Sequence, residues 1–230
     1  MTDPDAYIAL VSSLPSSERL FVAKQPPLSR LRLDRRLSVL AAEDAETLAR
    51  IESLLSWSSY DAQSDIAEVV ARARSLLGDL QRQTLRMIVA ERMEMRTAIA
   101  ALRLRRDGAE PPAQPWGFGR WLRHMAAHWS DPTFRLDASM PWLRSAVPLV
   151  EARDALGLER HLLDTSFRKL QRHAGQHHFD FEAVVMYVLK WNIFDRWAKA
   201  DAHAAAARFA QLSDEALQGY PELLFDGDAA

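Results

Sequence analysis

Two histidine pairs are the residues of this sequence whose spacing could support chemistry. His124 and His128 are four residues apart in a segment expected to be helical, and His173 and His177 have the same spacing. Imidazoles at positions i and i+4 project from one face of a helix, and two such pairs together could complete a tetrahedral zinc site. The HMAAH segment lacks the glutamate of a metalloprotease helix, and Gly175 is expected to end a helix before His177. We therefore favour a structural or surface role for these histidines and keep a metal-dependent helical enzyme as the alternative.

Motifs of the other common enzyme classes are missing from the sequence. It contains neither GxGxxG nor GxxxxGKS/T, the glycine-rich patterns that bind phosphates, and no GxSxG nucleophile elbow. With no cysteine it can form no disulfide, thiolate metal site or cysteine nucleophile, which suits a reducing compartment. A serine, histidine and acid triad is assembled by the fold and not by spacing, so the sequence leaves that arrangement open. We predict a chain that is not an enzyme and needs no cofactor.

The segment between residues 64 and 106 is rich in arginine and could present a phosphate-contacting stripe. Acidic residues interrupt it, at Glu68, Asp79, Glu91 and Glu94, and can pair with the arginines at helical spacing. We therefore favour a solvated, charged helix face and expect no nucleic-acid binding, with an arginine-rich nucleic-acid binder as the alternative. The arginines are Arg72, Arg74, Arg82, Arg86, Arg92, Arg96, Arg103, Arg105 and Arg106.

Composition is that of an ordinary globular protein. Of the 230 residues, 48% are hydrophobic and 26% are charged, and Lys+Arg 29 against Asp+Glu 31 gives a net charge of -2. The chain as a whole has no electrostatic bias towards nucleic acid or an anionic membrane. No run of about eighteen apolar residues occurs, and the N-terminus lacks a basic n-region, so we expect neither a membrane span nor secretion.

The tryptophans are concentrated in the second half of the chain. Most fall among aliphatic residues on expected helices, which favours packing in a core over stacking on a ligand. Trp116, in the segment PWGFG, is the exception, and we predict that Trp116 and Phe118 contribute to a partner surface. The second-half tryptophans are Trp116, Trp121, Trp129, Trp142, Trp191 and Trp197.

Apolar residues recur at three- and four-residue steps, which predicts an all-α fold, an elongated helical bundle. Residues 64 to 106 are expected to form one long amphipathic helix or two nearly collinear ones. A continuous rod of this length spans about 60 Å, and Gly78 is its weak point because glycine costs about 1 kcal/mol relative to alanine in a helix. Asp180 is expected to cap a later helix that has a wide apolar face.

A proline- and glycine-rich segment provides the clearest boundary in the chain. Residues 107–119, DGAEPPAQPWGFG, contain three prolines and three glycines and cannot continue a helix. We therefore predict two subdomains, an N-terminal helical unit of residues 1–106 and a C-terminal helical unit of residues 120–230, with 107–119 as the hinge.

Several segments resemble a bacterial family of uncharacterised proteins encoded beside V-type ATPase subunits. The similar segments cover most of the chain and carry no catalytic signature. They are YIALVSSLP, the following PP, LSVLAAEDAETLARIESLL, WLRHMAAHWSDPTFRLD and FDFEAVVMYVLKWNIFDRW.

That family looks like a reduced counterpart of the funnel subunit of V/A-type rotary ATPases, which is designated C, or d in eukaryotes. The funnel subunit is all-helical and lies between the central shaft and the membrane ring. It has a tyrosine-leucine-lysine run followed by an acidic, asparagine-containing stretch, and this sequence offers Tyr187, Leu189, Lys190, Asn192 and Asp195. The funnel subunit is longer and has three similar helical units, whereas this chain has room for about two, which puts a closed funnel in doubt.

The resemblance implies a non-catalytic accessory or central-stalk adaptor of a proton- or sodium-translocating V-type ATPase. Its partners would be the central shaft and the membrane ring, and it would lie in the cytoplasm at the inner face of the membrane, held there through the complex. We expect the partner surface to include the exposed face of the 64–106 segment and the residues Arg82, Arg86, Arg96, Trp116, Phe118, Tyr187, Asn192 and Asp195.

Overall fold

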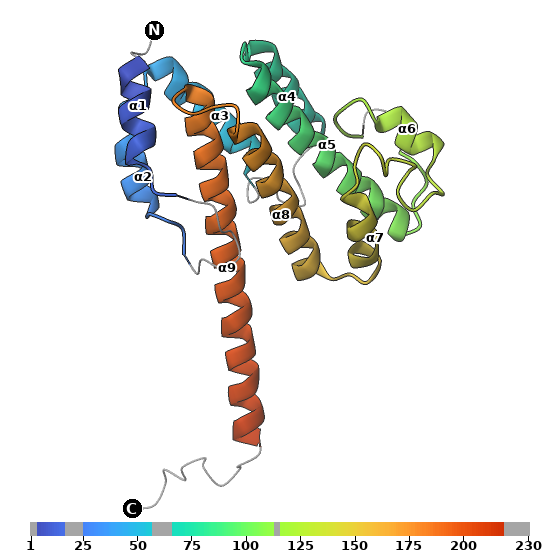
Figure 1. Cartoon of the computed structure of the whole chain (residues 1–230). Coiled ribbons are helices and arrows are strands. Elements are labelled where there is room, and N and C mark those ends of the chain that lie inside the picture. Colours follow the sequence, from blue (N-terminus) through green and yellow to red (C-terminus); the bar gives the residue numbers. More distant parts are fainter. Residues whose placement is uncertain (1–3, 17–24, 57–65, 113–115, 219–230) are drawn as a thin grey trace, which may run out of the picture.

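The computed structural model describes residues 4–16, 25–56, 66–112 and 116–218, and within these ranges the chain forms nine α-helices and no strand (Figure 1). The all-α prediction is confirmed. The helices are α1 (Pro4–Ser13), α2 (Arg30–Leu37), α3 (Ala42–Leu55), α4 (Ile66–Asp79), α5 (Gln83–Arg106), α6 (Leu122–Ala127), α7 (Leu143–Glu151), α8 (Ala155–Ala174) and α9 (Phe181–Gln218).

The segment predicted to be a rod is a pair of helices that fold back on each other. α4 ends at Asp79 and α5 begins at Gln83, after a turn in which Arg82 has an extended backbone. Ile66, at the start of α4, lines the same cleft as Ala100, late in α5, which two collinear helices could not achieve. The expectation of near collinearity was therefore wrong, and the pair forms a hairpin.

The turn of this hairpin explains why the helical periodicity did not reveal it. Leu80 is buried at 5% exposure and continues the apolar pattern into the turn. Arg86 donates hydrogen bonds to the carbonyl oxygens of Leu77 and Leu80 and so satisfies groups that the end of α4 leaves unbonded. The chain changes direction there without a proline and without losing buried apolar residues.

Two hydrophobic cores hold the helices together, and both contain residues from each side of the 107–119 segment. The first core contains residues of α1, α2, α3 and α4, of the first half of α5, of the second half of α8, and of α9. The second core joins the rest of α5 to Trp116, α6, α7 and the start of α8. Because α5 and α8 pass through both cores, the predicted division at 107–119 does not coincide with a division of the core.

Residues 116–119 of the predicted hinge pack tightly against α5. The backbone N–H of Phe118 donates to Thr97 Oγ1 at 2.8 Å. A Cβ atom on Gly117 would lie 2.5 Å from Thr97 Cγ2, and Gly119 has a φ of +106, a conformation that favours glycine. These glycines let the loop approach the helix closely, so the described part of this segment is fixed to the bundle.

The last helix, α9, is anchored at its start and extends beyond the other helices at its end (Figure 1). Its 38 residues correspond to a length of about 57 Å. As predicted, Asp180 caps it, accepting from the N–H of Ala183 at 2.8 Å. Val184, Val185 and Val188 in its first turns are fully buried. In the part of the chain that the structure covers, no helix is long and apolar enough to cross a membrane.

Candidate functional site

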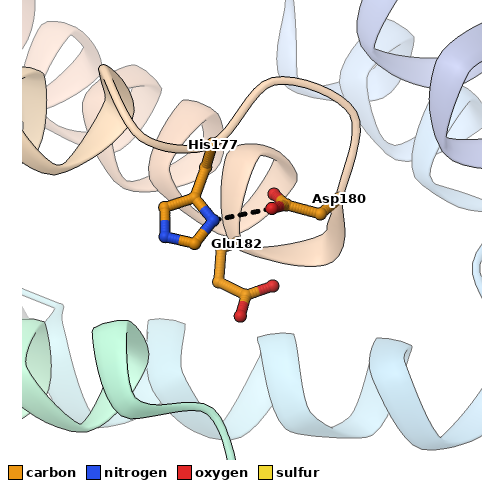
Figure 2. Close-up of side chains that lie close together, drawn as sticks. All are labelled: His177, Asp180 and Glu182. Atoms are coloured by element: carbon orange, nitrogen blue, oxygen red, sulfur yellow. Dashed lines mark hydrogen bonds and ion pairs between the residues drawn. The ribbon is translucent and has the colours of Figure 1, made fainter.

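A polar cluster lies where α8 leads into α9 (Figure 2). His177 and Asp180 belong to the connection, and Glu182 lies in the first turn of α9. One ligand atom of each residue lies within 4.8 Å of the other two, a spacing that could hold a metal ion. The closest pair is His177 Nδ1 and Asp180 Oδ2, at 2.6 Å. Nitrogen and carboxylate oxygen donors of this kind suit zinc.

The metal-ligating atoms of this cluster already have protein partners. His177 Nε2 lies 2.9 Å from Thr84 Oγ1, so both ring nitrogens of His177 are hydrogen-bonded. An Nδ1–H donor to the Asp180 carboxylate and an Nε2 acceptor for the Thr84 hydroxyl satisfy this arrangement with a neutral ring. To bind a metal, His177 would have to give up one of these bonds. The cluster therefore suits a link between α5 and the α8–α9 connection better than a metal centre.

Arg82, in the turn of the α4–α5 hairpin, extends the same network. Its Nη1 donates to Glu182 Oε2 at 3.1 Å and its Nη2 to Asp44 Oδ1 at 3.5 Å. Asp44 also accepts a hydrogen bond from the Tyr7 hydroxyl, and the Arg82 guanidinium lies over the Phe181 ring at 4.6 Å. The network thus connects α1, α3, the hairpin turn and the start of α9.

The two histidine pairs predicted as possible metal ligands do not come together. His124 and His128 stack on each other, with ring centroids 4.3 Å apart, and His128 Nδ1 lies 2.9 Å from the carbonyl oxygen of His124. His173, in the last turn of α8, lines a small cavity between α5, α8 and α9. Among the residues placed in the structure, the ligand atoms that cluster with His177 belong to Asp180 and Glu182, and no group joins the two pairs.

The predicted aromatic partner surface is also corrected by the structure. Trp116 is only 6% exposed and belongs to the second core, where it packs edge-on against Trp129 with ring centroids 6.1 Å apart. Phe118 is partly buried and packs against the first core. Because Gly117 and Gly119 bring the loop close to α5, the chain itself covers Trp116 and covers Phe118 in part.

Arginines predicted for a partner surface bond to groups within the chain. Arg96 donates to the carbonyl oxygens of Leu54 at 2.7 Å and Ser56 at 2.6 Å, at the end of α3. Arg86 likewise donates to the carbonyl oxygen of Leu80, just after the end of α4, and Arg82 pairs with Glu182. These side chains bind helix C-terminal carbonyls or acids of other elements, which secures the bundle.

The acids interleaved with the arginines pair between elements and not along one helix face. Glu91 pairs with Lys169 of α8 at 3.1 Å, and Asp79 pairs with Arg50 of α3 at 2.6 Å. Glu94 lies 3.8 Å from the Arg120 guanidinium. The prediction of pairs at helical spacing was therefore wrong for these three acids.

The residues that the predicted resemblance to the funnel subunit singled out lie on α9, and the first of them belong to its buried part. Tyr187 is 9% exposed, and burial raises the pKa of its hydroxyl to about 12. Asn192 Nδ2 donates to Glu52 Oε1 at 2.8 Å, and Glu52 also pairs with Arg30 at 2.7 Å. Asp195 pairs with Lys199 one turn later at 2.6 Å. Tyr187 and Asn192 thus stabilise the contact of α9 with the bundle.

Sequence reasoning missed a cleft of about 580 Å³ between α4, α5, α8 and the 116–118 loop. Four arginines and one glutamate line it, together with apolar residues of all three helices. Arg92, one of the four, donates to Ser166 Oγ, and burial together with the nearby Arg96 charge lowers its pKa to about 9. No sequence signal marks the cleft, because residues up to 130 positions apart form it.

Comparison of the chain with protein-family models, curated proteins and solved structures found no match. The resemblance to the family encoded beside V-type ATPase subunits therefore stays a prediction. Function has to be inferred from the residues and their arrangement.

Proposed function

We propose that the chain is a non-catalytic adaptor of a bacterial V-type ATPase, which links the rotor shaft to the membrane ring or assists their assembly. The observation that carries this proposal is the shape of α9, whose first turns are buried in the bundle and whose last turns extend clear of it (Figure 1). A helix held at one end and projecting at the other is suited to joining two bodies.

The projecting turns of α9 favour a protein partner on energetic grounds. Most helices in proteins gain their stability from packing of one face and not from helix propensity alone. In Figure 1 the last turns of α9 have no neighbouring helix among the described elements. Packing against a partner would supply that stabilisation. We therefore propose a partner contact at the end of α9 and not at Trp116.

The internal bonding of the bundle favours a mechanical role. Arg82 joins the hairpin turn to Glu182 at the base of α9, and His177 joins the α8–α9 connection to Thr84 of α5. Bonds of this kind fix the base of α9 relative to α5. A rigid base would let force on the projecting end be transmitted to the rest of the bundle.

The test is an affinity pull-down of the tagged full chain from gently solubilised native membranes, followed by mass spectrometry. Recovery of V-type ATPase rotor subunits in a fixed ratio would support the adaptor role. Recovery of no ATPase subunit, under conditions where the intact ATPase is shown to survive, would overturn it.

A further inference from the structure

We propose that the cleft between α4, α5 and α8 binds a small amphipathic organic anion, such as a medium-chain carboxylate. Its volume of about 580 Å³ lies within the range of roughly 300 to 1,000 Å³ that is usual for small-molecule sites. Its lining comes from α4, α5 and α8, from the 116–118 loop, and from Arg196 of α9. Such a cleft fits a compact ligand better than a flat protein surface.

The apolar part of the cleft would hold the hydrocarbon body of the ligand. Val70 of α4, Ile99 of α5 and Leu158 and Leu162 of α8 line it. All four side chains are at most 6% exposed, so they belong to packed helix faces. Burial of hydrocarbon against them is favourable because it removes apolar surface from water. This part of the site would not distinguish an anion from a neutral ligand.

The arginines would select the anionic head group. Arg92, Arg96 and Arg103 lie on one helix, α5, and all three line the cleft. The glutamate of the lining, Glu159, already pairs with Arg196, the fourth arginine. The residues lining the cleft therefore carry more positive than negative charge, which favours an anion over a neutral or cationic ligand.

Arg103 is the best placed of these arginines to bind the head group. Arg103 is exposed and lines the cleft, and its guanidinium forms no hydrogen bond or ion pair to another residue in the described ranges. Arg92 and Arg96 are bonded to Ser166 and to the end of α3. The guanidinium of Arg103 can form two parallel hydrogen bonds to a carboxylate without breaking a contact of the fold.

Isothermal titration calorimetry with the full chain tests the proposal, with decanoate as the probe, decanol as the neutral analogue and acetate as the head group alone. We expect decanoate to bind at least tenfold more tightly than either analogue. Arg103→Gln should weaken decanoate binding about fivefold and leave decanol binding unchanged. Arg74→Gln, which removes an exposed arginine of α4 outside the cleft, should change neither.

A second variant tests the place of binding independently of charge. Ala100 lines the cleft on α5, and Ala100→Leu keeps a strong helix former while filling part of the space. It should weaken decanoate and decanol alike by about tenfold, with an unchanged far-ultraviolet circular dichroism spectrum. Equal decanoate affinity in the wild type, Arg103→Gln and Ala100→Leu would overturn the proposal.

Vesicles separate a free ligand from a bilayer lipid. The full chain should bind soluble decanoate and show no greater sedimentation with phosphatidylglycerol vesicles than with phosphatidylcholine vesicles. Binding to phosphatidylglycerol vesicles without binding to decanoate would overturn the proposal in favour of a membrane surface. This outcome is separate from the adaptor role, because the cleft does not include the projecting turns of α9.

Discussion

The guanidinium of Arg82 lies 3.1 Å from the carboxylate of Glu182, a residue one hundred positions later in the chain. The contact joins the turn of the α4–α5 hairpin to the first turn of α9. Both acids that Arg82 contacts, Asp44 and Glu182, have side chains only 15% exposed. Arg82 therefore balances two half-buried carboxylates at the point where α9 enters the bundle.

Replacing Arg82 should loosen the base of α9. Arg82→Gln removes a cation that contacts both Asp44 and Glu182. We expect the free energy of unfolding to fall by about 1 to 2 kcal/mol, a loss between those typical of exposed and of buried ion pairs. Urea unfolding measures this change. Arg74→Gln, on the exposed face of α4, should change stability by less than about 0.5 kcal/mol. Equal effects of the two substitutions would contradict the assignment.

A matched pair of glycine substitutions tests the close approach of the 116–119 loop to α5. Gly117→Ala places a Cβ atom 2.5 Å from Thr97 Cγ2 and should destabilise the fold by about 1 to 3 kcal/mol. Gly78→Ala, in α4, meets no atom within 4 Å and should stabilise the fold by up to about 1 kcal/mol. Thermal unfolding distinguishes the two. A neutral Gly117→Ala would show that the loop is not packed in this way.

The His177 cluster should behave as a cross-link and not as a metal centre. His177→Ala removes the hydrogen bonds to Thr84 and Asp180, and we expect a loss of about 1 to 2 kcal/mol. Added zinc should leave the Tm of the wild-type chain unchanged, because the atoms that could bind it already have protein partners: His177 bonds to Thr84 and Asp180, and Glu182 accepts from Arg82. A metal bound to the native state raises Tm with concentration, so a zinc-dependent rise that His177→Ala abolishes would reverse this interpretation.

The loop after α6 should lose stability in acid because of Asp131. Its Oδ1 accepts from the backbone N–H groups of Arg135 at 3.0 Å and Thr133 at 2.9 Å, and these bonds lower the pKa of the carboxyl below its ordinary value of 3.8. Because the pKa of Asp131 is lower in the native state than in the unfolded state, its carboxylate stabilises the fold at pH values above 3.8. This stabilisation is lost as the pH falls from 3.8 through the lower pKa of the native state.

Urea unfolding at pH 7 and pH 3 measures this contribution. Asp131→Asn should lower the urea concentration at the unfolding midpoint at pH 7. Between pH 7 and pH 3 its free energy of unfolding should fall by less than that of the wild type. Glu68→Gln, which changes an exposed acid of α4, serves as the control. An identical pH response of the wild type and Asp131→Asn would contradict the proposed role.

The local features of the fold were predictable from the sequence. Helical periodicity predicted the all-α class, and a carboxylate before an apolar run predicted the cap that Asp180 provides for α9. These features depend on residues within one or two helical turns. The reversal of the chain at Leu80 was not predictable, because this buried leucine continues the helical apolar periodicity although it lies in the turn.

The candidate sites were mostly not predictable, because they depend on contacts between distant segments. His177 was noticed for its spacing from His173, yet its partners are Thr84 and Asp180. Trp116 was expected to contribute to a partner surface because it is an aromatic residue of the predicted hinge with little local core, but it belongs to the second core. In both cases the spacing along the chain gave no information about which helix would lie opposite.

The measurement that tests the adaptor role most directly is a paired pull-down with the full chain and with a chain that ends at residue 200. Circular dichroism first establishes that the shortened chain keeps its helical bundle. We predict that V-type ATPase rotor subunits are recovered in a fixed ratio with the full chain and are lost with the shortened one. Recovery of no rotor subunit with either chain, or equal recovery with both, would contradict a role for α9 as the projecting arm of an adaptor.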